Sequence, residues 1–161
     1  MKSFTRDASV SWLGTHQHGK GAITTQSDVL KNAPCVSGMR LESPSGTNPP
    51  ELIAAAHAGS FSMTLASELG KAGYSPDQID TTATVTMEDL ATGWTMTQIH
   101  LDVIATVPDA VQCDFIDAAL RAKLNCPVSR LLSANISMAA KLKLRAATAR
   151  TSRSRLRQHV G

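Results

Sequence analysis

One long segment of small residues constrains the fold of this chain more than any other feature: residues 48–70 read NPPELIAAAHAGSFSMTLASELG. Asn48 is suited to cap a helix that begins at Pro49, and Glu51 stands where a capping-box acid is expected. The sequence therefore predicts a helix that ends at Gly70 or near Gly73. Because Ala, Gly and Ser dominate its surface, another backbone can approach closely, and we expect a central, buried helix.

Alternation with a period of two on either side of this helix predicts two hairpins and two further strands. The predicted strands cover residues 8–14, 21–27, 35–43, 81–89, 94–107 and 135–146. A second helix follows Pro108 over residues 109–125, and a short third helix has Cys126 as its N-cap and Pro127 at its first position. The order of elements lacks βαβα alternation, so we predict an α+β fold whose sheet is mostly antiparallel.

Charge is distributed unevenly along the 161 residues, which are enough for one domain. Residues 1–117 hold 6 Lys/Arg and 13 Asp/Glu, a balance of −7, whereas residues 118–161 hold 10 Lys/Arg and no acid, a balance of +10. We predict a single domain over residues 1–146 and a basic, disordered tail over residues 147–161. The tail contains no aromatic residue on which bases could stack, which argues against nucleic-acid binding.

The N-terminal segment lacks the apolar region of a signal peptide, and no run of apolar residues reaches the roughly 18 needed to span a membrane. The 3 cysteines have no C-x-x-C spacing and make neither a disulfide framework nor a zinc site. These features predict a soluble protein of a reducing cytoplasm, with no membrane contact.

Cys126 is the strongest candidate for chemistry on physical grounds alone. At the start of a helix it meets oriented N–H groups and the positive end of the helix dipole, which favour the thiolate. The alternative is that it acts as a small buried hydrophobe. Cys113 lies on the preceding helix, roughly 20 Å away at 1.5 Å per residue, too far for a disulfide. We interpret Cys113 and Cys35 as core residues.

Three histidines and one serine could have either a catalytic or metal-binding role or a purely structural one. His57 stands one helical turn before Ser60, and we expect a hydrogen-bonded core histidine rather than a base. Ser60 lacks the G-x-S-x-G elbow of a serine hydrolase, and no acid is placed to orient His57. His16 and His18 form an i, i+2 pair without a nearby acid or thiol cluster, so we predict no metal site and no bound cofactor.

Arg40 and Glu51 flank a Gly- and Pro-rich turn and could meet across it as a charge-assisted pair. The alternative from the residues alone is a solvated arginine and a glutamate that serves only as part of the helix cap.

Two separated motifs, GTNPPELIAAAHAGSFSM and AKLNCPVSRLL, resemble the osmotically inducible protein C (OsmC) family, which is related to the organic hydroperoxide resistance proteins. The resemblance covers roughly residues 5 to 146. The sequences AAAHA and CPVS are more similar to the OsmC branch than to the organic hydroperoxide resistance branch. It implies an intertwined homodimer with the long helices at its centre and two active sites at the interface.

The resemblance also implies a reaction and site residues. In the family a peroxidatic cysteine on the first central helix attacks an organic hydroperoxide and becomes a sulfenic acid, and a second cysteine, matched by Cys126, condenses with it. An external dithiol, typically lipoyl-linked, reduces the disulfide. An arginine matched by Arg40 favours the thiolate, and a glutamate matched by Glu51 positions that arginine.

The chain departs from the family pattern at the peroxidatic position, where Ser60 stands. A serine hydroxyl forms almost no anion near neutral pH and cannot become a sulfenic acid. We therefore expect a hydroperoxide reductase of antioxidant defence whose turnover is abolished in this chain. The serine is either a natural variant or a deliberate replacement of one atom.

Two other functions stay open on the sequence. One is a non-enzymatic module that binds a small apolar molecule in the same interface pocket, which we expect to be mostly apolar with Arg40 as its cationic group. The other is a protein that binds anionic polymers through its basic tail.

Overall fold

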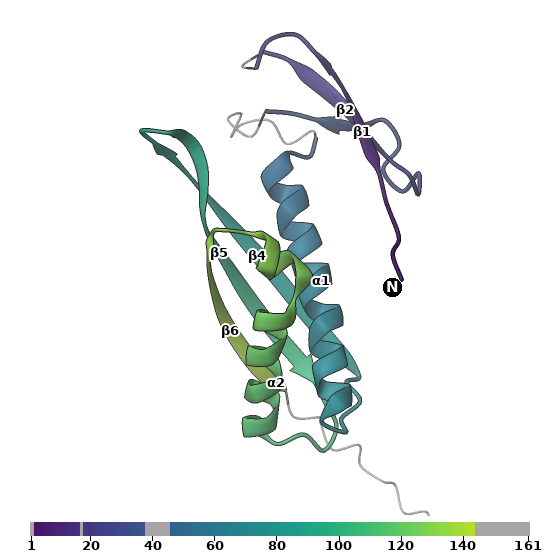
Figure 1. Ribbon diagram of the computed structural model, residues 1–161, viewed down its shortest axis with the longest axis vertical. Coiled ribbons are helices and arrows are strands. Elements are labelled where there is room, and N and C mark those ends of the chain that lie inside the picture. The colour runs from purple at the N-terminus through teal and green to yellow at the C-terminus, as the bar shows by residue number, and fades with distance from the viewer. Residues whose placement is uncertain (1, 17, 38–45, 144–161) are drawn as a thin grey trace, which may run out of the picture.

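The described part of the chain folds into two three-stranded sheets and three helices, as the α+β prediction requires. The computed structural model describes residues 2–16, 18–37 and 46–143. The elements in chain order are β1 (Ala8–Leu13), β2 (Lys20–Thr25), β3 (Ala33–Cys35), α1 (Pro49–Lys71), β4 (Gln78–Leu90), β5 (Gly93–Thr106), α2 (Gln112–Asn125), α3 (Pro127–Leu131) and β6 (Asn135–Lys143). Figure 1 shows the small sheet of β1 to β3 beyond the start of α1, and the larger sheet beside α1 and α2.

The start of α1 confirms the capping chemistry expected from the sequence. Asn48 is the N-cap, and its side-chain oxygen accepts a hydrogen bond from the Glu51 backbone N–H at 2.9 Å. The Glu51 carboxylate accepts from Thr47 Oγ1 at 3.1 Å, so only half of the capping box forms. The helix ends at Lys71, and Gly73 follows with a φ of +88°. Both ends of the helix are therefore where the sequence predicts them.

The larger sheet has the order β4-β5-β6. β4 and β5 form the predicted antiparallel hairpin, with a register shift between Thr86 and Met87. β6 pairs with β5 in parallel, because α2 and α3 carry the chain back along the sheet before β6 begins. The sheets are mostly antiparallel, as expected, with this one parallel pair.

A single hydrophobic core lies between the larger sheet and the helices α1 and α2. Its largest fully buried side chains come from all three parts: Phe61, Leu65 and Leu69 from α1, Ile99, Leu101 and Val103 from β5, and Phe115 from α2. Cys126 is also part of this core and is 0% exposed. The core therefore fixes α1 against the junction of α2 and α3, where the candidate site lies.

The structure corrects two predicted element bounds. The third strand is β3, Ala33–Cys35, and it does not continue through Val36 and Ser37, because after Cys35 the chain pairs with the segment before α1 through a bond from the Val36 N–H to the Thr47 carbonyl at 2.9 Å. Residues 38–43 of that prediction lie outside the described part. α2 begins at Gln112 rather than directly after Pro108, since Asp109 has a φ of +61°, which is not helical.

Two burial predictions are also corrected. Cys113 is exposed, because the first turn of α2 directs it away from the core, whereas Cys35 is buried as expected. α1 is not buried all round: one stripe along it is exposed in this chain, formed by Ala55, Ala56, Gly59, Met63, Ser67 and Gly70. The spacing of three or four residues places this stripe on one helix face.

None of the helices in the described ranges combines the length and apolar character needed to cross a bilayer. Arg40 and the predicted tail over residues 147–161 lie outside the described residues.

Candidate active site

Ser60 and Cys126, 66 positions apart in the chain, meet at the centre of the molecule. The Cys126 thiol donates a hydrogen bond to Ser60 Oγ at a distance of 3.3 Å. Ser60 lies near the middle of α1, and Cys126 is both the C-cap of α2 and the N-cap of α3. Its backbone N–H closes α2 on the Ala122 carbonyl at 2.8 Å, which fixes the place of the sulfur.

The environment of Cys126 acts on its thiol in two opposed ways. Burial raises the pKa of the thiol, because the apolar core disfavours an anion. In the thiolate form the bond to Ser60 reverses, and the Ser60 hydroxyl donates to the sulfur. This hydrogen bonding, with that from the backbone and side chain of Ser129, lowers the pKa by more than burial raises it, and the net pKa lies below the ordinary value. The backbone N–H groups approach the sulfur without forming a true side-chain capping bond, so we regard them as oriented dipoles.

The same cluster extends to His57 on α1. His57 is 0% exposed, and its Nε2 lies 2.8 Å from Ser129 Oγ. Burial lowers the pKa of His57, so its ring is neutral at pH 7. The expectation of a hydrogen-bonded core histidine is confirmed.

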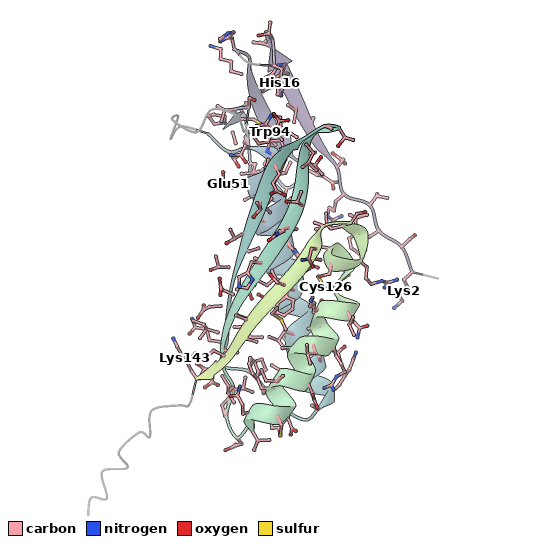
Figure 2. All side chains as sticks on the ribbon, turned by 90° about the vertical axis from the view of Figure 1, so that its left-hand side faces the viewer. Lys2, His16, Glu51, Trp94, Cys126 and Lys143 are labelled. Atoms are coloured by element: carbon pink, nitrogen blue, oxygen red, sulfur yellow. The ribbon has the colours of Figure 1, made fainter. Side chains whose placement is uncertain are left out.

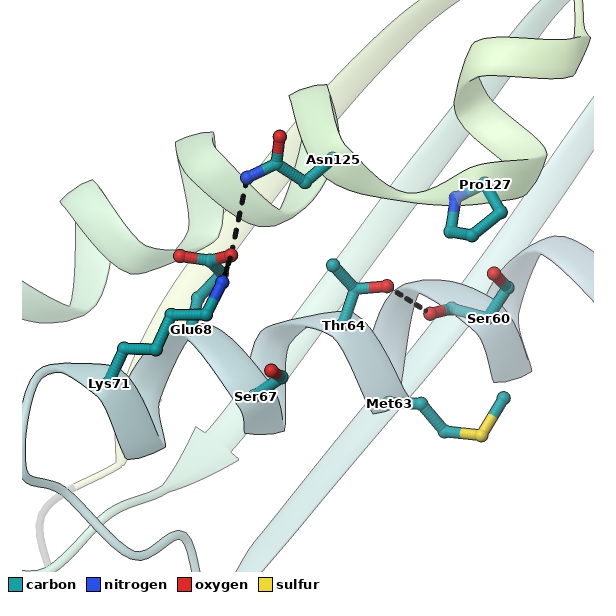
Figure 3. Close-up of a pocket in the computed structure, with 8 residues that line it drawn as sticks. All are labelled: Ser60, Met63, Thr64, Ser67, Glu68, Lys71, Asn125 and Pro127. Carbon is teal, nitrogen blue, oxygen red and sulfur yellow. Dashed lines mark hydrogen bonds and ion pairs between the residues drawn. The ribbon is translucent and has the colours of Figure 1, made fainter. Parts of the chain in front are cut away.

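A groove of about 390 Å³ opens over Ser60. Figure 3 shows one wall made by α1 and the other by the junction of α2 and α3. The residues that line it are Ser60, Met63, Thr64, Ser67, Glu68, Lys71, Asn125 and Pro127. Cys126 stands between two of these lining residues in the sequence but is itself buried. The groove thus gives access to position 60, and Cys126 lies beneath it.

A charged cluster closes the far end of the groove. Glu68 is 3% exposed and accepts from Lys71 Nζ at 2.7 Å, from Asn125 Nδ2 at 3.2 Å and from Arg121 Nε at 3.3 Å. The bond from Lys71 is the main reason that the pKa of Glu68 is lowered. The amino-acid pattern alone does not reveal this cluster. The i, i+3 spacing of Glu68 and Lys71 was its only local signal.

Glu51, the other described residue of the predicted site, lies apart from Ser60. The two positions are nine residues apart on α1, roughly 14 Å at 1.5 Å per residue. Figure 2 shows Glu51 toward the small sheet and Cys126 farther along the molecule. Arg40 lies outside the described residues, so its predicted pairing with Glu51 stays a prediction.

Metal ligands do not gather anywhere in the described ranges: no three His, Cys, Asp or Glu side chains are placed to hold an ion there. Cys35, Cys113 and Cys126 are all free cysteines.

Comparison with known proteins identifies the family. Residues 42–141 match the family described as OsmC-like protein. The chain is 42% identical over 132 residues to peroxiredoxin OsmC of Escherichia coli K12, which covers 82% of this chain and 92% of that protein, and the same values hold for peroxiredoxin OsmC of Shigella flexneri.

Solved structures share the fold at lower identity. An OsmC-like protein of Vibrio cholerae has a TM-score of 0.70 at 13% identity, covering 86% of this chain and 99% of that one. The organic hydroperoxide resistance protein OhrB of Bacillus subtilis has a TM-score of 0.64 at 22% identity, covering 87% and 98%. With a family match over most of its length and a relative at 42% identity, this chain belongs to the OsmC-like protein family.

Proposed function

We propose that this chain has the scaffold of a thiol-dependent organic hydroperoxide reductase in which Ser60 occupies the place of the peroxidatic thiol. The observation that carries the proposal is the 3.3 Å contact between Ser60 Oγ and Cys126 Sγ. A sulfur atom in place of Ser60 Oγ would need only a small side-chain movement to reach the 2.05 Å of a disulfide. The names of the relatives, peroxiredoxin and organic hydroperoxide resistance protein, support this class of reaction.

The burial of the two positions supports the division of roles between them. Position 60 lines the groove, where a hydroperoxide could enter, whereas Cys126 is 0% exposed and lies behind it. The thiol at position 60 would therefore meet the substrate first. Cys126 lies where it can meet only what forms at position 60, which supports the proposed role of a resolving cysteine.

The reaction of the thiol form has two balanced steps. A thiolate at position 60 attacks the terminal oxygen of ROOH, the O–O bond breaks, and with one proton the products are a sulfenic acid and ROH. The Cys126 thiolate then attacks that sulfur, a disulfide forms, and hydroxide leaves and takes up a proton as water. An external dithiol reduces the disulfide. We propose a lipoyl-type dithiol in a reducing cytoplasm, with no bound cofactor.

Ser60 stops this cycle at its first step. An alcohol is almost entirely protonated at neutral pH, and oxygen does not form the sulfenic-acid equivalent that the second step needs. We therefore propose that the chain as written does not turn over hydroperoxide, although its groove and Cys126 are in place.

A homodimer would complete the site. The exposed stripe on α1 carries small residues with Met63, which is 71% exposed, and a second copy could cover it. The resemblance implies active sites at the dimer interface, with Arg40 and Glu51 as site residues. Because Glu51 is far along α1 from Ser60 of the same chain, we propose that the partner subunit supplies the neighbouring groups of each site.

The test is a side-by-side assay of three chains for loss of an organic hydroperoxide with a lipoyl dithiol: the chain as written, Ser60→Cys, and Ser67→Cys as a matched control in the same groove. We expect turnover by Ser60→Cys only, and Arg40→Ala on that background should remove most of it. Turnover by the chain as written would disprove the inactivity, and no turnover by Ser60→Cys would disprove the peroxidase assignment.

The second candidate is a binding module for a small apolar molecule, favoured by the open groove beside exposed Met63. It predicts that apolar ligands raise the melting temperature of the chain as written, and that Met63→Ser reduces this effect. An inactive Ser60→Cys chain together with such a shift would make this the leading function.

A further inference from the structure

The reductase scheme assigns no role to His57 or Ser129, although both belong to the partly buried cluster around Cys126. His57 Nε2 lies 2.8 Å from Ser129 Oγ, and Ser129 follows Cys126 by three residues in α3, so its side chain and the Cys126 side chain are neighbours on one helix face. Hydrogen bonding by Ser129 lowers the pKa of the Cys126 thiol. The cluster joins the middle of α1 to the first turn of α3. It therefore brings the Ser129 hydroxyl beside a fully buried imidazole and within one helical turn of a fully buried thiol.

The hydrogen count in this cluster decides what the imidazole can do. Ser129 Oγ has a single hydrogen, so it can donate to the sulfur only if it accepts from His57. That requires the tautomer with the proton on Nε2, which we assign from the hydrogen-bond network.

The other ring nitrogen agrees with this assignment. His57 Nδ1 is buried and has no hydrogen-bond partner among the described residues. In the Nε2–H tautomer the atom left without a partner is an acceptor. In the other tautomer it would be a buried N–H donor, and unpaired buried donors are the rarer case in proteins. Protonating both nitrogens is disfavoured because burial opposes the charged ring.

We propose that His57 and Ser129 are positioning residues for Cys126: the neutral imidazole donates from Nε2 to Ser129 Oγ and so directs the Ser129 hydroxyl at the sulfur. With the Ser60 hydroxyl on the groove side, the sulfur then has two hydroxyl donors for its anionic form. This inference deepens the proposed function and rests on it for the role of Cys126 as the resolving thiol.

Charged groups on the surrounding elements are accounted for separately. The charged residues of the three helices are Glu51, Glu68 and Lys71 on α1, Asp114, Asp117, Arg121 and Lys123 on α2, and Arg130 on α3. Glu68 is bonded to both Lys71 and Arg121, and Arg130 is exposed. Since the variants tested below leave all eight unchanged, their effect on Cys126 is common to every measurement.

The experiment measures the thiolate absorbance of Cys126 near 240 nm against pH in the chain as written, with the trace of Cys126→Ser subtracted. Ser129→Ala and His57→Leu should each raise the pKa of Cys126 by about one unit, a tenfold loss of thiolate below that pKa. His57→Gln, which keeps an N–H donor, should leave the value close to the original.

The double variant distinguishes positioning from a general effect on folding. In the Ser129→Ala background, His57→Leu should produce no further shift, because its effect passes through the hydroxyl. Additive shifts, or no shift in Ser129→Ala, would overturn the proposal. If His57→Leu does not fold, Ser129→Ala and His57→Gln still test the proposal. Ser129→Ala should shift the pKa of Cys126, and His57→Gln should not.

The titration needs no turnover, so it separates this inference from the proposed function. The reductase proposal fails if Ser60→Cys is inactive, whatever the titration gives. The positioning proposal fails if Cys126 titrates identically in all variants, even when Ser60→Cys is active.

Discussion

At the level of single residues, Glu68 shows how the charged end of the groove is held. Its nearly buried carboxylate is bonded to Lys71 on its own helix and to Arg121 and Asn125 on α2. Hydrogen bonds from these groups, led by that from Lys71, keep the pKa of Glu68 below its ordinary value. The carboxylate thus ties α1 to α2 beside the site in its ionised form.

Acid should weaken this tie. A carboxyl whose pKa is lower in the folded than in the unfolded state stabilises the fold fully above the unfolded value, and the contribution is lost as the pH falls through the folded value. Glu68→Gln should therefore lower the urea midpoint at pH 7 and have less effect near pH 3. Urea unfolding at both pH values measures this, with Glu88→Gln on exposed β4 as the control. An equal decrease of the urea midpoint at both pH values would contradict this stabilising role of the ionised carboxylate.

The residues around Cys126 also show the limit of prediction at this scale. Cys126 at a helix start and His57 as a bonded core histidine were predictable, because caps and helix spacing are local patterns. The contact of Ser129 was not, although Ser129 stands in the quoted CPVS motif, because its hydroxyl lies 2.8 Å from Nε2 of His57, 72 positions away. No local pattern in the sequence records such a contact.

At the level of elements, the start of α1 depends on one side chain. Asn48 has extended backbone angles and satisfies the Glu51 N–H, one of the first donors of the helix that no helical carbonyl can reach. Asn48→Ala should lower the free energy of unfolding by about 1 kcal/mol, whereas Asn48→Asp should change it by only a few tenths. Equilibrium urea unfolding of the two variants measures the difference. Equal destabilisation by both would show that the cap bond is not the cause.

The direction of β6 shows why strand order is harder to predict than strand position. Alternation in residues 135–146 marks a strand but is the same for parallel and antiparallel pairing. The direction of β6 depends on the end of the sheet at which the chain emerges after α2 and α3. That position depends on how the helices pack against the core. Likewise, the true start of α2 depends on a left-handed turn at Asp109 that the pattern before Gln112 does not specify.

At the level of the whole molecule, two surfaces are unusually exposed for one chain. All six residues of β1 are exposed, including Val10 at 57% and Leu13 at 66%, and the small sheet does not pack against the main core. The other surface is the stripe of small residues on α1. Both are explained if a second copy of the chain covers them, which is the dimer we propose.

Gly59 provides the sharpest test of that dimer. A Cβ built at Gly59 meets nothing within 4 Å in this chain, so a larger side chain fits the single subunit. Replacing glycine inside a helix also removes a penalty of about 0.5–1 kcal/mol. Gly59→Leu should therefore keep the subunit folded, yet prevent close approach of a second α1.

Sedimentation equilibrium measures the outcome directly. The chain as written should have twice the subunit mass of 17.1 kDa, and Gly59→Leu should shift toward the mass of one subunit. Thr84→Leu, which adds the same side chain to an exposed position of β4, should remain a dimer. A dimer unaffected by Gly59→Leu would place the interface away from α1. The groove over Ser60 would then belong to a single subunit, and the partner would have no part in the site.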